Sequence, residues 1–334
     1  MTLFQTLAHF LRSPAYGVPT LTYFATALDT GFPAANGRKI AWQVILDSFL
    51  RRPTMQVATQ YQQVDRKAGL SLHDFNRHYR TPRRPVVVTD AIDNWKSRSG
   101  WTFDFFKQRY GATLVTVHEY HGDKYQPNDV RQMHLADYID GVLTKDWESF
   151  PYYIRDNWRL LVEYPELSAD YSFPRYFFDW FSLLPSFMRL PYPRIFIGPK
   201  GAVTPLHMDI WRTHAWLSQL SGRKRWLLYP PEQTRYLYDF QVDPEHPDLK
   251  RFPLYRQAAP LECVIGPGDT VFVPSGWAHW VVSLDPTISL TSNYMGPGCF
   301  WPAFSNCTRE LVIKRAWNAS TRFIAGSPRT RPAG

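Results

Sequence analysis

Three residues at two places in the chain could together hold a metal ion. His207 and Asp209 lie two positions apart in the segment TPLHMD, and His279 lies about 70 residues later in FVPSGWAHWV. Two imidazoles and one carboxylate are the facial ligand set that leaves half of an iron(II) coordination sphere open for substrates and oxygen. A single His-x-Asp pair also occurs by chance, and one histidine alone often fills a structural, half-buried position. The three residues together predict an iron-dependent oxygenase.

The three side chains can converge only if strands carry them. Side chains at positions i and i+2 of a strand point to the same face, so His207 and Asp209 would meet while Met208 turns away. The β-branched and aromatic run at 270–274 follows the turn signal GPGD and leads up to His279, and WVVSL continues the strand character beyond it. We therefore expect two neighbouring strands, one for each half of the set.

A lysine on another expected strand would place a positive charge near these ligands. The turn SGR leads into KRWLLY, in which Lys224, Trp226 and Leu228 share one face. A lysine among apolar and aromatic side chains is costly unless an anion meets it there. Its basic neighbours Arg223 and Arg225 leave open a solvated basic run, although strand parity turns Lys224 away from both.

The next expected strand, TISLTSNY, has one wholly polar face. Ser289, Thr291 and Asn293 alternate with Ile288 and Leu290 along it. A polar face can be the wet side of a sheet. This one follows the third candidate ligand, where a lumen lined with hydrogen-bond donors would help to hold a dicarboxylate.

These motifs together resemble a known family. GPKGAVTPLHMD, GRKRWLLYPPEQ, VIGPGDTVFVPSGWAHWVVSLD and TISLTSNY are similar to the jumonji-C (JmjC) class of iron(II)- and 2-oxoglutarate-dependent oxygenases. The resemblance is to the small hydroxylase branch, which includes the factor-inhibiting-HIF asparaginyl hydroxylase and the lysyl hydroxylase of splicing proteins. It covers residues 71–295. It implies a mainly β fold, a double-stranded β-helix (jelly-roll or cupin) barrel with a helical N-terminal extension and a C-terminal helix.

The resemblance also implies a role for each matching residue. His207, Asp209 and His279 match the iron ligands. Lys224 matches the lysine that pairs with the distal carboxylate of 2-oxoglutarate, and the other positions around the cosubstrate are matched by Tyr153, Thr204, Thr291 and Asn293. Leu217 departs from the pattern of the splicing-protein hydroxylase, which has asparagine there, so this pocket would offer one polar contact fewer. The implied chemistry couples decarboxylation of 2-oxoglutarate by O2 to hydroxylation of an unactivated carbon.

Several aromatic and basic residues flank the candidate ligands. Trp211, Arg212 and Trp280 are predicted substrate contacts, and Trp277 and Tyr294 are further candidates. Aromatic side chains near the mouth of a barrel are also ordinary packing, so we expect no more than two of these five to grip a substrate.

Three other histidines lie near the motifs. His118 and His121 occur in HEYHGD, directly after the expected strand TLVTV. Because the resemblance places the metal elsewhere, we expect these two in a surface turn. His214 follows His207 at a spacing that does not determine its face, and a structural role is expected for it.

The substrate class stays open at the level of sequence. A protein or peptide side chain is favoured, because the carboxylate-containing ligand set resembles that of protein hydroxylases. Alternatives with the same chemistry are a tRNA nucleoside or a small molecule. A lysine demethylase is less favoured, because that branch commonly has glutamate where Asp209 stands and adds reader domains. A catalytically silent cupin that only binds ligands would hold no iron and form no succinate.

Composition indicates one large core with appendages. The chain has 334 residues, of which 44% are hydrophobic and 16% aromatic. No apolar run approaches the length of a membrane span, and the N-terminus lacks a convincing signal peptide, so we expect no membrane association. Cys263, Cys299 and Cys307 form no paired framework and have no zinc spacing. A reducing, cytoplasmic location is therefore expected.

The formal net charge of +9 is unevenly distributed. Residues 1–100 carry 13 Lys or Arg and 6 Asp or Glu, and residues 308–334 carry 6 and 1, whereas residues 101–307 carry 19 and 22. Basic flanks of this kind could touch tRNA or an acidic protein. A solvated surface with a loose tail explains the same charges and is the commoner situation.

The pattern along the chain predicts one catalytic domain with two extensions. Residues 1–61 have apolar stripes at helical spacing and form a helical N-terminal extension. Residues 62–298 form the JmjC or cupin-like catalytic domain. Residues 299–334 form a C-terminal helix, whose segment TRELVIKRAWN could make a homodimer, and a disordered basic tail.

Overall fold

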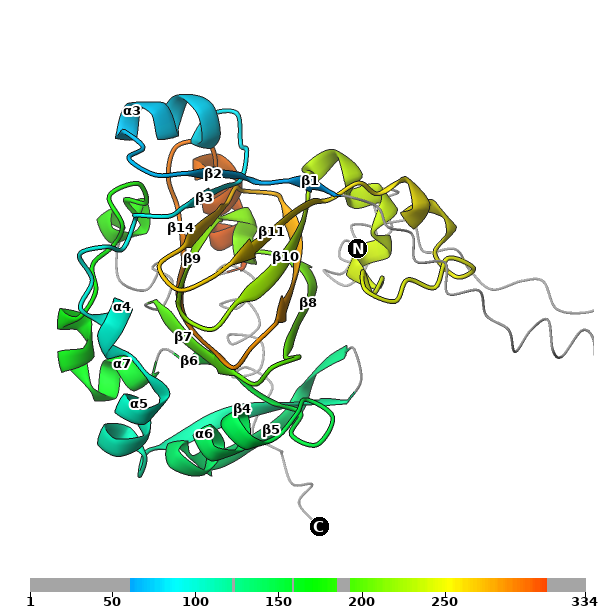
Figure 1. Cartoon of the computed structure of the whole chain (residues 1–334). Helices are drawn as coiled ribbons and strands as arrows, with labels where there is room; N and C mark the ends of the chain where they lie inside the picture. Colours follow the sequence, from blue (N-terminus) through cyan, green and yellow to red (C-terminus); the bar gives the residue numbers. More distant parts are fainter. Residues whose placement is uncertain (1–60, 122–123, 158, 185–192, 311–334) are drawn as a thin grey trace, which may run out of the picture. The chain divides into compact units, whose positions relative to one another are not determined.

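The computed structural model describes residues 61–121, 124–157, 159–184 and 193–310 (Figure 1). The helices predicted before residue 61, and the C-terminal tail from residue 311, lie outside the described residues. Within the described ranges two mixed β-sheets form the framework of the chain, so the prediction of a mainly β fold is confirmed.

Two mixed sheets build the described part of the chain. The smaller sheet has the strand order β1-β11-β10-β13-β8, with β1 at Gln62–Gln63, β11 at Leu261–Ile265, β10 at Lys224–Tyr229, β13 at Ala278–Ser283 and β8 at Val203–Met208. The larger sheet has the order β2-β3-β12-β9-β14-β7-β6-β4-β5. Its strands are β2 (Asp65–Lys67), β3 (Val86–Val88), β12 (Thr270–Val273), β9 (His214–Ser221), β14 (Thr287–Tyr294), β7 (Arg194–Gly198), β6 (Tyr152–Asn157), β4 (Leu114–His121) and β5 (Lys124–His134).

Short helices connect and cover these strands. They are α3 (Leu72–Phe75), η1 (Asn76–Arg80), α4 (Ser97–Gly100), α5 (Phe103–Tyr110), α6 (Leu135–Thr144), α7 (Arg159–Glu163), η2 (Pro165–Ala169), η3 (Trp180–Leu183), η5 (Ile210–Arg212), η6 (Pro231–Tyr236), η7 (Tyr238–Phe240) and η8 (Pro253–Gln257). Residues 300–310 form a further helix near the C-terminus. None of the helices in the described ranges has the length and apolar character needed to span a bilayer.

One hydrophobic cluster fills the space between the two sheets. It joins Leu217 of β9 and Val271 of β12 in the larger sheet to Trp226 of β10 and Val281 of β13 in the smaller one. β12 is buried along its whole length, which fits its β-branched and aromatic sequence TVFV. The facing sheets enclose a barrel interior that the chain lines with its own side chains.

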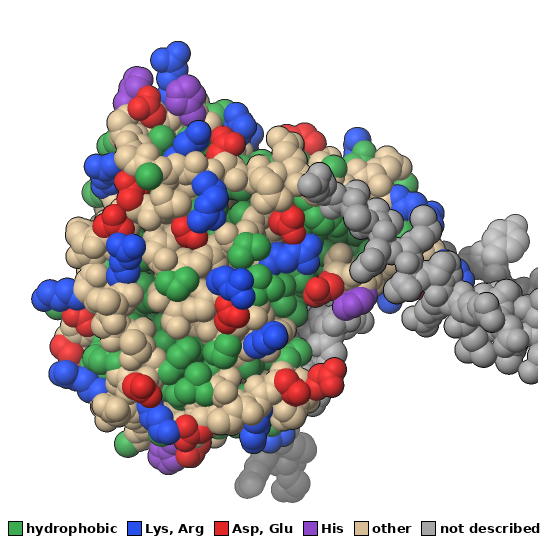
Figure 2. Space-filling model, in the orientation of Figure 1, with side chains coloured by type: hydrophobic (Ala, Val, Ile, Leu, Met, Phe, Trp, Pro, Cys, Tyr) green, Lys and Arg blue, Asp and Glu red, His purple; other side chains and the backbone are tan. Residues whose placement is uncertain are grey.

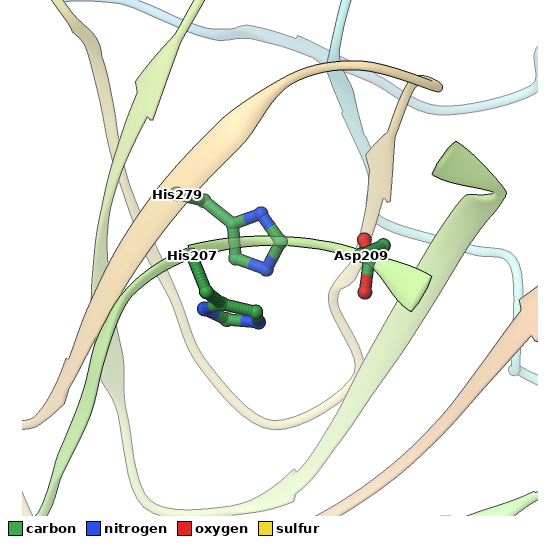
Figure 3. Close-up of side chains that lie close together, drawn as sticks. All are labelled: His207, Asp209 and His279. Carbon is green, nitrogen blue, oxygen red and sulfur yellow. The ribbon is translucent and has the colours of Figure 1, made fainter. Parts of the chain in front are cut away.

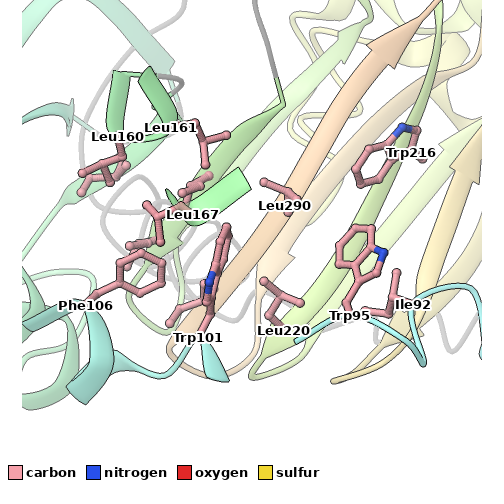
Figure 4. Packing of buried hydrophobic residues seen from close by; sticks show 14 of the residues in the cluster. Ile92, Trp95, Trp101, Phe106, Leu160, Leu161, Leu167, Trp216, Leu220 and Leu290 are labelled. Atoms are coloured by element: carbon pink, nitrogen blue, oxygen red, sulfur yellow. The ribbon is translucent and has the colours of Figure 1, made fainter. Parts of the chain in front are cut away.

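A second cluster packs the helices against the outer face of the larger sheet (Figure 4). Trp216 of β9 and Leu290 of β14 supply the sheet side, and Trp101 and Phe106 supply the helical side, with their ring centroids 5.4 Å apart. Thr102 begins α5, because its hydroxyl oxygen accepts a hydrogen bond from the backbone N–H of Phe105. This layer covers the outer face of the larger sheet.

The structure contradicts one local prediction in this region. β4 continues through His118 to His121, so HEYHGD does not begin with a surface turn. β4 pairs with β5 on one side and with β6 on the other, and the cross-strand partner of His118 on β6 is Tyr153. Backbone pairing on both sides continues the strand through residues whose polarity suggested a loop.

Candidate functional site

The two halves of the predicted ligand set lie on neighbouring strands. β8 and β13 are antiparallel, and His207 is the direct cross-strand partner of His279, with ring centroids 4.2 Å apart. Asp209 follows the end of β8 with extended backbone angles, so its side chain returns to the same face (Figure 3). One ligand atom from each of the three residues lies within 4.8 Å of the others. The expectation that strands carry the two histidines is confirmed.

A tight turn sets the direction in which β13 leaves β12. The backbone N–H of Trp277 donates to the carbonyl of Pro274 at 3.2 Å, which closes a four-residue turn. Gly276, the third residue of this turn, has a φ of +85°. Glycine adopts that conformation without steric cost. The strand therefore starts at Ala278 with His279 facing the interior.

Backbone carbonyls orient both imidazoles. The Nδ1 of His207 donates to the carbonyl of Pro205 at 2.8 Å, and the Nδ1 of His279 lies 3.4 Å from the carbonyl of Trp277. Each contact leaves Nε2 as the atom that can bind a metal. The indole of Trp226 stacks on His279 with centroids 5.5 Å apart. The donor set, its tautomers and its open side all fit a divalent transition metal.

Electrostatics keep His207 in the form that a metal requires. Burial, and then the neighbouring His279, lower the pKa of His207 to about 3. A metal ligand must be a neutral imidazole. At neutral pH His207 is therefore already deprotonated at the nitrogen that would bind.

The same barrel interior contains a cavity of about 340 Å³. The three candidate ligands line it together with four residues that the sequence predicted around the cosubstrate, namely Thr204, Lys224, Thr291 and Asn293. Leu217 also lines it and supplies the predicted apolar wall. All of β14 is buried, so the polar face of TISLTSNY is not the wet side of a sheet.

Lys224 lies at the buried end of this arrangement. It is 1% exposed, and its Nζ donates to the hydroxyl of Tyr153 at 2.8 Å. The nitrogen also lies 5.3 Å from the ring centroid of Tyr153 and 5.5 Å from that of Phe196. Burial lowers the pKa of Lys224 to about 7. A solvated basic run is excluded for this residue, and within the described ranges no acidic side chain pairs with it.

The family of cupin-like domains matches residues 72–297 of the chain. The chain belongs to this family. The predicted cupin barrel and the JmjC resemblance are thus confirmed.

Curated relatives show the same affiliation. The chain is 34% identical to the 2-oxoglutarate and iron-dependent oxygenase JMJD4 of Gallus gallus over 261 residues, which are 71% of this chain and 60% of the relative. It is 32% identical to the bifunctional arginine demethylase and lysyl-hydroxylase psr-1 of Caenorhabditis elegans, over 77% of this chain and 66% of that protein. It is 32% identical to the lysine-specific demethylase JMJ21 of Arabidopsis thaliana, over 70% of this chain and 25% of that protein. The chain thus spans between a quarter and two thirds of the length of these relatives.

Thr291 and Asn293, which line the cavity, are both hydrogen-bonded to other residues of the protein. The Oγ1 of Thr291 donates to the carbonyl of Trp216 at 2.6 Å. The Nδ2 of Asn293 donates to Thr213 at 3.1 Å, and its Oδ1 accepts a hydrogen bond from Arg194. Asn293 therefore links β14 to the loop that carries Asp209.

Two arginines that the sequence reasoning did not single out also line the cavity. Arg155 lies two residues after Tyr153 on β6, so strand parity could have placed it on the same face. Arg194 lies opposite Thr291 across β7 and β14. Only the register between those strands brings Arg194 to the site.

The predicted substrate contacts separate into two groups. Trp211 and Arg212 lie in η5, next to Asp209, and face a groove outside the cavity. Trp280 is 2% exposed and packs against Leu206 and Leu227 on the other face of the smaller sheet. Successive residues of a strand point to opposite faces, so the neighbour of His279 faces away from the cavity. This placement gives no support to a substrate contact by Trp280.

The remaining aromatic and histidine candidates are structural. Trp277 donates from its indole to the carbonyl of Arg83 at 2.8 Å, and Tyr294 is fully buried. The Nδ1 of His214 accepts from the backbone N–H of Ser275 at 2.9 Å, and its Nε2 donates to the carbonyl of Pro297 at 3.0 Å. Burial lowers the pKa of His214 to about 4, so a neutral ring joins these two backbone segments.

Proposed function

We propose that this protein is an iron(II)- and 2-oxoglutarate-dependent dioxygenase that hydroxylates an unactivated carbon on a protein or peptide side chain. The observation that carries the proposal is one cavity that holds both a three-residue metal ligand set and a buried lysine. Burial of a cation in that position is costly unless an anion meets it there. The names of relatives similar to this chain, an iron-dependent oxygenase and a lysyl-hydroxylase among them, support the same chemistry.

Each part of the site has a definite task in this reaction. His207, Asp209 and His279 would hold iron(II) and leave one side of it open. Bound iron supplies the activation of O2, coupled to conversion of 2-oxoglutarate into succinate and carbon dioxide. Lys224 would bind the distal carboxylate of 2-oxoglutarate, and the hydroxyl of Tyr153 positions the lysine nitrogen for that contact.

The walls of the cavity set its dielectric and its selectivity. Ala215, Leu217 and Val273 line it with apolar surface and exclude water from the region between the ligands and Lys224. A low dielectric strengthens the attraction between the lysine and a carboxylate. The arriving carboxylate would raise the pKa of Lys224 again, so binding of the dicarboxylate takes up a proton at alkaline pH.

A protein substrate is favoured over tRNA. Relatives similar to this chain have names that refer to lysyl hydroxylation and to arginine or lysine demethylation. On the face drawn in Figure 2, basic and acidic side chains are interspersed rather than gathered into one positive surface. Nucleic-acid binding requires a basic surface that follows the phosphates.

Oligomeric state and location are separate proposals. We propose homodimer formation through the C-terminal helix, which light scattering during size-exclusion chromatography would test on the full chain. A monomeric mass at micromolar concentration would contradict it. The cytoplasmic location expected from the free cysteines is tested by fractionating cells that express the tagged protein.

Mass spectrometry of a cell lysate tests the proposed reaction. The protein, iron(II) and 2-oxoglutarate are added to the lysate, and species that gain one oxygen are identified while succinate is measured. We expect oxidised proteins with the wild type and none with His207→Ala. A His73→Ala variant, which changes an exposed histidine on α3, is the matched control and should behave as the wild type.

Two results would contradict parts of the proposal. Succinate formation that persists in His207→Ala would show that the metal assignment is wrong. Oxygen incorporation confined to tRNA nucleosides would retain the chemistry and replace the substrate class.

A further inference from the structure

A second groove begins at the candidate metal centre and runs toward the C-terminal helix. It has a volume of about 380 Å³ and is lined by Asp209, Trp211, Arg212, Asn306, Arg309 and Glu310. Asp209 also lines the inner cavity, so the two spaces meet at a metal ligand. Ile210, 44% exposed, lines the inner cavity at this junction. A substrate that occupied both the cavity and the groove would pass over this apolar side chain.

The wall of the groove is held in an unusual backbone conformation. Trp211 and Arg212 have φ values of +53° and +55°, in the left-handed region that non-glycine residues rarely adopt. The indole Nε1 of Trp211 donates to Glu310 at 2.5 Å, and the hydroxyl of Ser275 donates to the carbonyl of Arg212 at 2.6 Å. Such strain persists only where surrounding contacts over-determine it, and it clusters at functional sites. These contacts keep Arg212 at the groove.

Two guanidinium groups give the groove its charge. Arg212 and Arg309 are both exposed, and neither forms an ion pair with any residue of the described ranges. Asp209 and Glu310 would balance them in the absence of a metal. A divalent cation bound by His207, Asp209 and His279 would leave the groove net positive.

We propose that this groove binds acidic residues that flank the hydroxylated residue of a protein substrate. The inference rests on the proposed function, since it names the kind of protein sequence that the same site takes. The target side chain would enter the cavity past Ile210, and a carboxylate nearby in the substrate would meet Arg212 and Arg309. Guanidinium groups bind carboxylates with two parallel hydrogen bonds, which makes arginine suited to this recognition.

Peptide binding tests the groove without any need for turnover. The full-length protein is loaded with Mn²⁺ and 2-oxoglutarate without oxygen, and fluorescein-labelled hexa-aspartate and hexa-lysine peptides are titrated by fluorescence anisotropy. We expect the aspartate peptide to bind at least about tenfold more tightly than the lysine peptide. Removal of Mn²⁺ should weaken binding of the aspartate peptide several-fold, because Asp209 then offsets one arginine.

Charge reversal identifies the surface. The double variant Arg212→Glu and Arg309→Glu should weaken binding of the aspartate peptide about tenfold or more. The matched control, Arg77→Glu with Arg256→Glu, changes the net charge equally at exposed residues outside the groove and should change the affinity less than about twofold. Equal losses in the two double variants, or equal binding of the two peptides by the wild type, would overturn the proposal.

Two further measurements separate this inference from other effects. Arg309 lies on the C-terminal helix rather than in the loop that carries Asp209. A loss of peptide affinity in the single variant Arg309→Glu, at unchanged Mn²⁺ affinity, therefore distinguishes docking from damage to the metal site. In the lysate experiment, oxidised proteins without acidic residues near the oxidised position would refute the groove and leave the proposed function standing. Normal peptide binding without succinate formation would support the groove and refute the proposed function.

Discussion

Replacement of Lys224 by methionine should make the apoprotein more stable while it abolishes cosubstrate binding. The lysine is 1% exposed, and burial lowers its pKa from 10.5 to about 7. At 1.36 kcal/mol per pKa unit, this difference corresponds to about 5 kcal/mol of unfavourable burial of the charged form below pH 7. Loss of the hydrogen bond to Tyr153 and of the contacts with two aromatic faces offsets about 2 kcal/mol of that. Lys224→Met should therefore stabilise the apoprotein by about 2 to 3 kcal/mol at pH 6 to 7.

The pH dependence gives this prediction its direction. In the unfolded chain the lysine keeps its proton up to pH 10.5, whereas in the folded chain it loses the proton near pH 7. Between these values the unfolded state binds more protons, so the stability of the wild type rises with pH. The advantage of Lys224→Met should be largest below pH 7, should vanish near pH 9, where only about 2 kcal/mol of the linkage remains, and should reverse toward pH 10.5.

Urea denaturation of the apoproteins at several pH values between 6 and 10 measures this difference directly. Lys67→Met, which removes an exposed lysine, is the control and should give a curve parallel to that of the wild type. A Lys224→Met protein that is less stable than the wild type at pH 6, or that differs from it by the same amount at every pH, would refute the reasoning. Addition of 2-oxoglutarate should raise the unfolding midpoint of the wild type and of Lys67→Met only.

Three further predictions follow from other contacts of the site. Tyr153→Phe removes the hydroxyl that positions Lys224. Isothermal titration should therefore show that 2-oxoglutarate binds about fivefold more weakly, or by about 1 kcal/mol, at unchanged metal affinity. An unchanged affinity for 2-oxoglutarate would contradict this expectation. Asp209→Ala should weaken Mn²⁺ binding by more than about 100-fold, whereas Asp209→Glu should retain part of it, as read by electron paramagnetic resonance of free Mn²⁺. The pKa of His214 is lowered to about 4 in the folded state, so the unfolded state takes up a proton first as the pH falls. About 3 kcal/mol of stability should therefore be lost between pH 6.5 and pH 4. His214→Gln should remove that part of the acid sensitivity in urea titrations, and an acid profile equal to that of the wild type would contradict the assignment.

Local periodicity was sufficient to predict much of the site. Alternation along a strand places His207 and Asp209 on one face and turns Lys224 away from Arg223 and Arg225, and the structure agrees with both expectations. The same rule would have placed Arg155 beside Tyr153 and turned Trp280 away from the cavity. Parity along a strand, and not closeness in sequence to a ligand, decides which side chains reach the cavity.

Other features depend on contacts between segments that are far apart in sequence. The strand character of HEYHGD comes from pairing of β4 with β5 and β6, which local propensity does not contain. Arg194 reaches the cavity because β7 lies opposite β14 in one particular register. The groove beside Asp209 exists because residues 300–310 return to the loop at Trp211.

The sequence by itself determined the ligand types, the strand parity that aims them and the chemistry that this donor set can support. Those properties reside in side-chain identity and in the two-residue repeat of a strand, which are local. Only the tertiary structure decided that the ligands and Lys224 share one buried cavity, because burial and charge depend on which distant strands pack together. Removal from water lowers the pKa of His207 to about 3, which leaves its imidazole neutral for a metal. It lowers the pKa of Lys224 to about 7, so the charged form of this lysine is fully stabilised only when a carboxylate binds beside it.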